Sequence, residues 1–598
     1  MRHAPASILP LALAVSLALP QPRALAAQVR AEPPLEVLHG FTLIDGSGGP
    51  PVPDAAIAVR GSRIVMVGTR RELLESPSAR NAIVVDLGGG WVVPGLVDAH
   101  VHLSTSPDRE TAEAELYRML YAGITAVRDM AGDARALASL ARDSRLGEIE
   151  APDVYFSAVV AGPPFFADPR PQAAAAGERA GEVPWIQAIT PTTDPELAVA
   201  LARGTYATGL KIYADLDAAT VRALTEEAHR QGMQVWAHSM VFPARPLEVV
   251  EAGVDVVSHV CTMAWEAMAD APRRSDEDRV PRYEAFSATS PVFGQLFAAM
   301  RSRGTILDAT LAMYARAERA TSLAPGTRPA AGCDTAFARD LVREAAAAGV
   351  KIAAGTDFST PPDDPFPALH LELEELVEQG GLTPMQAIVA ATSMGAEAIG
   401  IESTHGLIAE GRRLDMVLLE ADPLADISNM RKIRAAWKNA VRYERDAYRS
   451  RFPEPVSEQQ PVAAASGIAS PRAMLEGWLD MWRRYDLDRA DQLLLADDAL
   501  TWFPSDGEEL IEGHEAVRAY LERIGFVSGG FLPENELWVE QATISDFGDS
   551  AVIGGLWYFG RRADRERAAR GNLTLVLVRE GAGWRIAHVS FGRYGPAR

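Results

Sequence analysis

The chain has 598 residues, of which 48% are hydrophobic, enough to bury a sizeable core and to form several domains. Its formal net charge of -22 at pH 7 argues against nucleic acid or an anionic membrane surface as a partner, because both repel a strongly acidic protein. We therefore expect the partner to be a small-molecule substrate or ligand.

The first 27 residues have the pattern of a secretory signal peptide. A basic start, MRH, precedes a short apolar core from Ile8 to Leu19, and the small residues ALAA at 24–27 form a cleavage site. The core is too short for a spanning helix, and no other segment is long and apolar enough to cross a bilayer. We predict that residues 1–27 are cleaved, rather than kept as an anchor, and that the protein is exported, to the periplasm or as a secreted protein.

Two separate stretches predict β-structure outside the main domain. Residues 35–92 are short strands separated by turns rich in Gly, Pro and Asp, which is typical of a small β-domain. Residues 404–450 contain similar β material in the strings GLIAEG, LDMVLLEA and RAAWKNAV.

Residues 93–403, between these stretches, alternate apolar strand-like segments with amphipathic helical ones. LDAATVRALTEEAHRQG, for example, has apolar residues three and four apart and ends at Gly, as many helices do. Alternating strands and helices imply a parallel sheet, and eight such units fit a (β/α)8 TIM-like barrel of the α/β class. The predicted strands are 94–103, 123–131, 153–161, 208–214, 234–240, 254–261, 304–312 and 350–358.

Side chains that can bind a metal stand at the carboxyl ends of these strands. In VVPGLVDAHVHL, His100 and His102 are two residues apart, so both imidazoles share one face of the strand. Catalytic residues of a (β/α)8 barrel lie at this end, so the series predicts a metal-dependent hydrolase. The further candidates are Lys211 in GLKIY, His238 in WAHS, His259 in SHV and Asp357 in AGTDF.

The end of the chain predicts a linker and a separate domain. Residues 451–470 are rich in Pro, Ser, Ala and Gln without helical or strand periodicity, and residues 471–598 combine two helices with four strands. The last strand is expected to place Trp584, Ile586 and His588 on one face. His588 could act as an acid or base inside this domain, and a packed structural histidine is the favoured interpretation. None of the six candidate ligands lies in this domain, so the chemistry is not expected to need it.

The strings VVPGLVDAHVHL, AGITAVRDMAG, GLKIY, WAHS, SHV, AAGTDF and GLIAEGRRLDMVLLEADPLADI resemble the amidohydrolase superfamily, in its imidazolonepropionase-like and prolidase-like branch. The resemblance covers about residues 35 to 445 and implies that 35–92 and 404–450 pair into one β-sandwich beside the barrel. It departs from the usual pattern at DAT (308–310) and at RRLDMVLL, and neither change is expected to touch a metal ligand. The last domain, with its closing GAGWRIAHVSF, is similar to the SnoaL-like, ketosteroid-isomerase-like α+β cone fold, whose members include enzymes, ligand-binding cups and oligomerisation units. A homo-oligomer is therefore a further possibility.

The resemblance also implies a binuclear metal site. His100, His102 and Asp357 would bind one ion, His238 and His259 would bind a second, and a carboxylated Lys211 would bridge the two. A protonated lysine has only donors, whereas its carbamate offers anionic oxygens. Neutral imidazoles and carboxylates suit Zn²⁺. Asp357 would also act as general base and acid, and Tyr213, two residues after Lys211, could donate to an oxyanion.

The implied activity is hydrolysis of the C–N amide bond of a dipeptide or an N-acyl amino acid by a metal-bridged hydroxide. The same binuclear site could instead serve a lactonase, a cyclic amidase or a phosphotriesterase. A different class also stays open, a ligand-binding scaffold with a catalytically silent barrel, although a silent barrel has no need to keep all six ligands. Metal analysis would distinguish the enzyme from the scaffold.

Long loops after strands 3 and 6 are expected to wall the pocket, unless they pack on each other or on another subunit. Their aromatic residues and arginines suit an amide substrate with an apolar side chain and a carboxylate, and Arg128 is another candidate partner for that carboxylate. The residues are Phe165, Phe166, Trp185, Trp265, Tyr283, Arg273, Arg274 and Arg282.

The two cysteines, Cys261 and Cys333, could form a disulfide in an exported protein, but buried unpaired thiols are the favoured interpretation. The remaining histidines lie away from strand ends and are expected to be structural: His39, His229, His370, His405 and His514.

Overall fold

The computed structural model describes residues 32–103, 109–167, 169–175, 177–277, 279–321, 332–452, 470–504, 510–530, 535–560, 568–580 and 583–593. The predicted signal peptide (1–27) and most of the predicted linker (451–470) lie outside the described residues. Among the helices that are described, none has the length and apolar character needed to cross a membrane.

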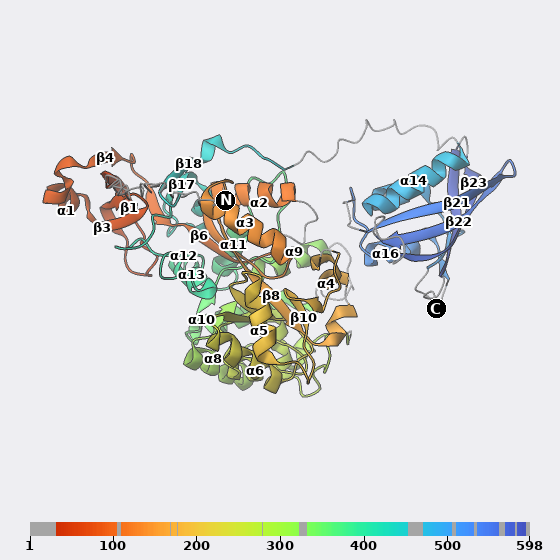
Figure 1. The fold of residues 1–598 in the computed structure, drawn as a ribbon, viewed down its shortest axis with the longest axis horizontal. Coiled ribbons are helices and arrows are strands. Elements are labelled where there is room, and N and C mark those ends of the chain that lie inside the picture. Colours follow the sequence, from red (N-terminus) through yellow and green to blue (C-terminus); the bar gives the residue numbers. More distant parts are fainter. Residues whose placement is uncertain are drawn as a thin grey trace, which may run out of the picture.

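Eight parallel strands form a nearly closed barrel, which confirms the predicted (β/α)8 fold (Figure 1). Each strand pairs with the next along the chain, and backbone hydrogen bonds join the last strand region to the first, from Ala99 N to Ala354 O (2.9 Å) and from Asp357 N to His100 O (2.8 Å). The strands are β6 (Leu96–Val101), β7 (Ile124–Asp129), β8 (Asp153–Ala161), β11 (Gly209–Ile212), β12 (Gln234–His238), β13 (Val256–Ser258), β14 (Ile306–Asp308) and β15 (Ile352–Ala353).

Helices follow the strands and cover the outside of the barrel. In α6, Asp217 caps the first turn by accepting a hydrogen bond from Thr220 N, and the helix buries Val221, Leu224 and Ala228. The chain leaves this helix through Gly232, whose φ of 75° favours glycine. The helices of this region are α2 (Arg109–Tyr121), α3 (Ala134–Leu146), α4 (Pro169–Ala174), α5 (Pro195–Gly204), α6 (Ala218–Arg230), α7 (Pro246–Glu251), α8 (Pro291–Arg303), α9 (Leu311–Thr321), α10 (Thr335–Ala347), α11 (Leu369–Glu378), α12 (Pro384–Ala390) and α13 (Ser393–Ile399), with 3-10 turns η2 (Pro163–Ala167), η3 (Val260–Ala267) and η4 (Tyr283–Ala285).

One eight-stranded sheet beside the barrel combines strands from both ends of the catalytic region. β5 (Trp91–Pro94) pairs antiparallel with β16 (Met416–Leu419), so that Val93 lies opposite Val417. The strand order is β18-β17-β16-β5-β1-β2-β3, with β4 beside β1. The other strands are β1 (Leu35–Leu43), β2 (Val52–Arg60), β3 (Arg63–Thr69), β4 (Ile83–Asp86), β17 (Ile433–Lys438) and β18 (Val441–Glu444), and α1 (Arg70–Glu75) packs against this sheet.

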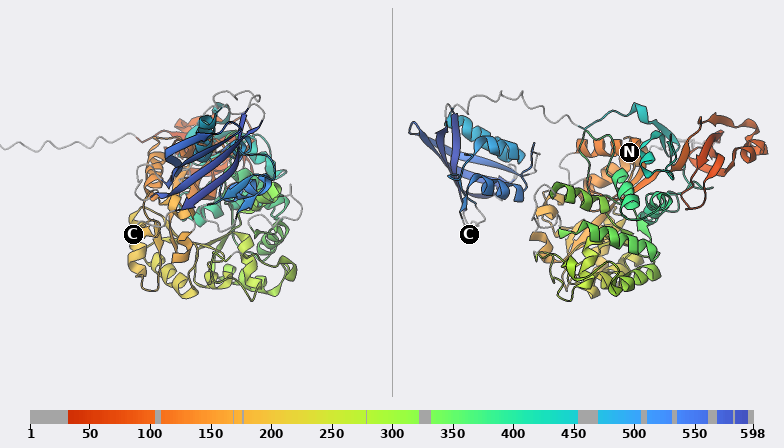
Figure 2. Two further views of the ribbon diagram at one scale, coloured as in Figure 1. Left: turned by 90° about the vertical axis from the view of Figure 1, so that its right-hand side faces the viewer. Right: turned by 180° about the vertical axis from the view of Figure 1, so that it is seen from behind.

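The last domain is a six-stranded sheet with helices on one face (Figures 1 and 2). Its order is β20-β19-β24-β23-β22-β21, and its core contains the buried Trp478 and Trp502. The elements are α14 (Pro471–Arg484), α15 (Leu487–Leu493), α16 (His514–Arg523), β19 (Thr501–Phe503), β20 (Ile511–Glu512), β21 (Glu536–Asp546), β22 (Ser550–Gly560), β23 (Ala569–Glu580) and β24 (Gly583–Arg593).

The prediction for the last strand was wrong in one respect. Ile586 lies opposite Leu577, but His588 lies opposite Val576, so the register shifts by one residue between them. Such a bulge reverses the alternation of faces, which puts His588 on the face opposite Trp584 and Ile586. Its Nδ1 lies 2.7 Å from Oγ1 of Thr501.

Cys261 and Cys333 form a disulfide, so the favoured interpretation of two unpaired thiols was also wrong. Their Cα atoms are 5.6 Å apart, within the usual range for a disulfide. The bond joins η3, which begins directly after His259, to the segment just before α10.

Candidate metal centre

The barrel brings the predicted ligands together at the carboxyl ends of its strands. His100, His259 and Asp357 each offer a ligand atom, and these atoms all lie within 4.8 Å of one another. The ring of His238 is 4.7 Å from the ring of His259, measured between centroids. The ring of His102 is 5.4 Å from that of His100. The structure therefore places the four histidines and Asp357 in one cluster, and their role as metal ligands stays a prediction.

Asp357 is the shared partner of the histidines. Its Oδ1 lies 2.8 Å from Nε2 of His102 and 3.3 Å from Nε2 of His100, while its Oδ2 lies 3.8 Å from Nδ1 of His259. Burial acts to raise the pKa of this carboxyl, but the facing imidazoles outweigh burial and hold the pKa well below its usual value. Asp357 is therefore ionised at neutral pH, as a metal ligand must be.

Lys211 has the environment that a carboxylated lysine needs. It lies in β11 with 1% of its surface exposed, and its Nζ has no hydrogen-bond partner in the described part of the chain. Burial, with the charge of Arg128 as the next cause, lowers the pKa of the Lys211 ammonium to about 7. A large fraction of this amine is therefore neutral at pH 7, which is the form that reacts with CO₂. The buried, unpartnered nitrogen fits a carbamate that bridges metal ions.

The imidazoles on the other side of the cluster are also held neutral. Burial lowers the pKa of His259 to about 3 and that of His238 well below its usual value, with the nearby Lys211 charge adding to both shifts. Neutral imidazole is the form that binds a metal.

The backbone at this end of the barrel adopts conformations that most residues avoid. His259, Thr310 and Asp357 have φ values of 75°, 52° and 58°, in the left-handed region. Strained residues of this kind are found at functional sites, where the surrounding fold holds them in place. Here they direct the chain at the ends of β13, β14 and β15.

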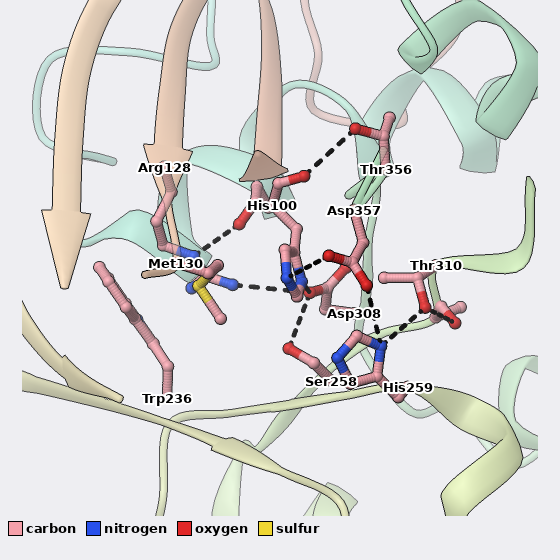
Figure 3. A network of polar contacts seen from close by, with 12 residues as sticks. His100, Arg128, Met130, Trp236, Ser258, His259, Asp308, Thr310, Thr356 and Asp357 are labelled. Atoms are coloured by element: carbon pink, nitrogen blue, oxygen red, sulfur yellow. Dashed lines mark hydrogen bonds and ion pairs between the residues drawn. The ribbon is translucent and has the colours of Figure 1, made fainter. Parts of the chain in front are cut away.

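A carboxylate that the sequence analysis passed over contacts a predicted ligand (Figure 3). Asp308, in the DAT string, has its Oδ2 2.7 Å from Nδ1 of His100, so the expectation that this departure touches no ligand was wrong. Ser258 donates to the same Oδ2 over 2.8 Å. The available signal was an acidic residue inside an otherwise apolar strand, TILDAT, where a buried charge needs a partner.

Arg128 was proposed from the sequence as a partner for a substrate carboxylate, and the structure contradicts this. It is fully buried inside the barrel, with its guanidinium 4.2 Å from the ring centroid of Trp236. It donates to the carbonyl oxygens of Ala99 (2.6 Å) and Ala398 (2.9 Å). A substrate in the barrel mouth cannot reach a group held in this way.

Of the predicted wall residues, Phe165 lies beside Tyr213, which contacts the cluster. Its ring is 4.3 Å from that of Tyr213, which in turn lies 3.9 Å from the ring of His238. Trp185 is instead buried and donates to Ala174 O, and Trp265 packs on Met240 and Met268. Tyr283 packs on Phe286 and Phe337 and donates to Gly332 O, so these three aromatic residues pack within the protein.

The loop arginines also have partners of their own. Arg274 pairs with Asp276 and Arg282 pairs with Asp270, and both are exposed, as is Arg273. The histidines expected to be structural lie away from the cluster with separate contacts: His39 near Asp86, His229 with Asp255, His370 with Ala122 O, His405 with Thr404 and His514 near Asp491.

Comparison with known families agrees with this architecture. The model of the amidohydrolase family matches residues 91–259 and 299–440, just over half of the chain. The model of the SnoaL-like domain matches residues 472–592.

Curated relatives and solved structures match the same region. The chain is 26% identical to the ochratoxinase of Aspergillus niger over 476 residues, covering 71% of this chain and 89% of that protein. It is 27% identical to the imidazolonepropionase of Ralstonia nicotianae over 414 residues, covering 65% and 92%. The crystal structure of the Aspergillus niger ochratoxinase has a TM-score of 0.54 at 22% identity, covering 69% of this chain and 96% of that one. A Xaa-Pro dipeptidase structure with bound methionine has the same TM-score and identity, covering 69% and 100%. These structural matches establish a shared fold. Since the family model covers most of the barrel and the adjoining strands, the chain belongs to the amidohydrolase family.

Proposed function

We propose that this protein hydrolyses the C–N amide bond of a dipeptide or an N-acyl amino acid at a centre of two divalent metal ions, with Zn²⁺ as the expected metal. The observation that carries the proposal is the buried Nζ of Lys211, which has no hydrogen-bond partner among the described residues, beside a cluster of four histidines and Asp357. The names of the relatives, which include an imidazolonepropionase and a Xaa-Pro dipeptidase, support an amide or peptide bond as the target.

The residues present fit such a centre. His100, His102 and Asp357 would bind one ion, His238 and His259 the other, and carboxylated Lys211 both. When bound, two divalent ions lower the pKa of a shared water towards 7 and polarise a carbonyl oxygen. Asp357, which is ionised and 20% exposed, can accept a proton and return it to the leaving amine.

We assign the stabilisation of an oxyanion to Tyr213. Its ring packs between the rings of Phe165 and His238, and these contacts restrict the movement of the side chain. We expect Tyr213→Phe to lower kcat by roughly 10²- to 10³-fold, because it removes one oxyanion donor, while metal content stays unchanged. Steady-state kinetics with metal analysis of the same sample measures both. An unchanged kcat would remove this role from Tyr213.

Arg316 is the arginine that we assign to the substrate carboxylate. It is exposed on α9, which follows β14 directly, and its guanidinium lies 5.1 Å from the ring centroid of Phe358, the residue after Asp357. Among the described residues, no carboxylate pairs with Arg316, in contrast to the loop arginines.

We expect Arg316→Met to raise KM roughly 10- to 100-fold for an N-acyl amino acid, as the loss of a charge-assisted hydrogen bond would do. The KM for the corresponding carboxamide should stay unchanged. Arg282→Met is a matched control, since Arg282 already pairs with Asp270, and both KM values should stay as in the wild type. An equal increase for acid and carboxamide in Arg316→Met would contradict the assignment.

A substrate screen tests the proposed function itself. The full chain, loaded with Zn²⁺ and bicarbonate, is assayed on dipeptides, N-acyl amino acids, cyclic amides, lactones and phosphotriesters. We expect the highest kcat/KM on an acyclic amide. Turnover of lactones or phosphotriesters alone would contradict the proposed substrate class, and a chain that binds metal without turnover of any class would support a silent scaffold.

We also propose that the protein is exported after cleavage of residues 1–27. The disulfide between Cys261 and Cys333 supports this, because disulfides persist in oxidising compartments such as the periplasm or the medium.

A further inference from the structure

A second carboxylate lies behind the first predicted ligand. Asp308, the last residue of β14, is fully buried, and its Oδ2 lies 2.7 Å from Nδ1 of His100 (Figure 3). An ionised carboxylate has no proton to give, so Nδ1 of His100 carries the hydrogen and donates it. With Nδ1 donating to Asp308, the opposite ring nitrogen, Nε2, is the one that a metal ion would bind, and it faces Oδ1 of Asp357, 3.3 Å away.

Asp308 is itself held in place by polar groups. Ser258 Oγ donates to the same Oδ2 over 2.8 Å, and a terminal nitrogen of Arg128 lies 3.7 Å from it. The guanidinium of Arg128 cannot move far, because it lies over Trp236 and donates to two backbone carbonyls. The interior of a (β/α)8 barrel is usually filled with branched apolar residues. Buried charges are tolerated there when they are paired, and Arg128 is the cation that balances Asp308.

The backbone at Gly355 packs closely against both Asp308 and His100. A Cβ atom on Gly355 would lie 2.2 Å from Oδ1 of Asp308 and 2.8 Å from Cβ of His100. The chain therefore passes close to both side chains at a position where a side chain would not fit. Oδ1 of Asp308 has no hydrogen-bond partner among the residues that the structure describes, so the contacts at Oδ2 orient the carboxylate.

We propose that Asp308 is a positioning residue of the metal centre, which fixes the tautomer and the orientation of His100 so that Nε2 is the ligand atom. Arg128 and Ser258 in turn fix Asp308. This inference rests on the proposed function, because it requires a metal ion at Nε2 of His100.

Asp308→Asn tests the inference with little change in shape. An asparagine can present its NH₂ group to Nδ1, which leaves the hydrogen on Nε2 and removes that nitrogen as a ligand. We expect the apparent Kd for Zn²⁺ to rise roughly 10- to 100-fold, as is usual when a carboxylate behind a ligating histidine is lost. The visible absorption spectrum of the Co²⁺-loaded protein should change as well. If the single variant does not fold, Asp308→Asn with Arg128→Met removes both buried charges together and is measured in its place.

Two serines provide a matched comparison. Ser258→Ala removes the hydrogen bond to Asp308, whereas Ser157→Ala removes an equally buried hydrogen bond, from Ser157 Oγ to Met130 O (2.7 Å), that does not involve Asp308. We expect Ser258→Ala to weaken Zn²⁺ binding about two- to fivefold, the equivalent of one ordinary hydrogen bond, and Ser157→Ala to leave it unchanged.

Three outcomes would overturn the inference. Wild-type Zn²⁺ affinity and an unchanged Co²⁺ spectrum in Asp308→Asn would show that His100 does not depend on Asp308. Equal weakening by the two serine variants would show a general disturbance of the barrel. A wild-type chain that binds no metal would overturn the proposed function as well. In the first two outcomes the wild-type chain still binds metal, so the two kinds of failure can be told apart.

Discussion

Replacing Lys211 with alanine is expected to remove metal binding and hydrolysis together. The carbamate would be the ligand shared by both ions, and metal-ion catalysis contributes several kcal/mol, so the loss of kcat/KM should be on the order of 10³-fold or more. Short carboxylates such as acetate or propionate should restore part of the activity, because they offer the same pair of anionic oxygens. Metal analysis and kinetics on the same preparation check this result.

The control for this variant is a lysine away from the barrel interior. Lys351 is exposed and pairs with Glu397, so Lys351→Ala should keep wild-type metal content and activity. Lys211→Met should fold as stably as the wild type, because it replaces a buried amine for which the described residues provide no hydrogen-bond partner. Lys211→Ala with full activity and two ions per chain would contradict the bridging role.

The pKa of Lys211 determines the pH dependence that we expect for metal loading. Carboxylation needs the neutral amine, and the pKa of Lys211 is about 7, so the ammonium predominates below that pH. Reconstitution of the metal-free chain with Zn²⁺ and bicarbonate should therefore be slow at pH 6 and should become faster as the pH rises through 7.

Replacing Asp357 with asparagine is expected to have the second large effect. Asn keeps the shape of Asp and tolerates the left-handed backbone at this position, where φ is 58°, so the fold should be retained. Loss of the general base should lower kcat by roughly 10²- to 10⁴-fold, and loss of the anionic ligand should weaken binding of one metal ion. The value of kcat measured on metal-saturated protein reports the loss of the base, and a metal titration reports the weaker binding of the ion.

Asp215 offers a matched control for that variant. It also has a left-handed backbone, with φ of 59°, but it binds Ser275 in a loop and is not among the predicted ligands. Asp215→Asn should therefore leave metal content unchanged and kcat within about threefold, the scale of a surface hydrogen bond. Activity of Asp357→Asn within tenfold of the wild type would contradict the assignment of Asp357 as the base.

The barrel could be predicted because its signals are local. Each strand is a short apolar run, and each candidate ligand stands at the end of such a run, so the carboxyl-end rule of the fold placed residues as distant in sequence as His100 and Asp357 in one region. The structure brings them together as that rule requires.

What could not be predicted depends on contacts between distant segments. Asp308 and His100 are 208 residues apart, and the sequence gives no sign of which buried group pairs with Asp308. The pairing of Cys261 with Cys333 likewise depends on how η3 packs against the start of α10. The face of the sheet on which His588 lies depends on a one-residue bulge. The alternation of Trp584, Arg585 and Ile586 does not reveal that bulge.

The loops above the barrel were the weakest part of the prediction for the same reason. Aromatic residues in loops can face a substrate or each other, and composition does not distinguish these cases. Trp185, Trp265 and Tyr283 pack within the protein, whereas Phe165 lies beside Tyr213. Substrate recognition therefore has to be tested at Tyr213 and Arg316 rather than at the loop aromatics.

The proposed function requires that Lys211 is carboxylated and bridges two metal ions. The most direct test is metal analysis of the full chain after reconstitution with Zn²⁺ and ¹³C-bicarbonate, combined with ¹³C NMR. We predict about two ions per chain, as in other two-metal sites, together with a carbamate carbon signal that is absent from Lys211→Met. A chain that binds no ion after reconstitution, or that binds two ions without a carbamate signal, would contradict the claim.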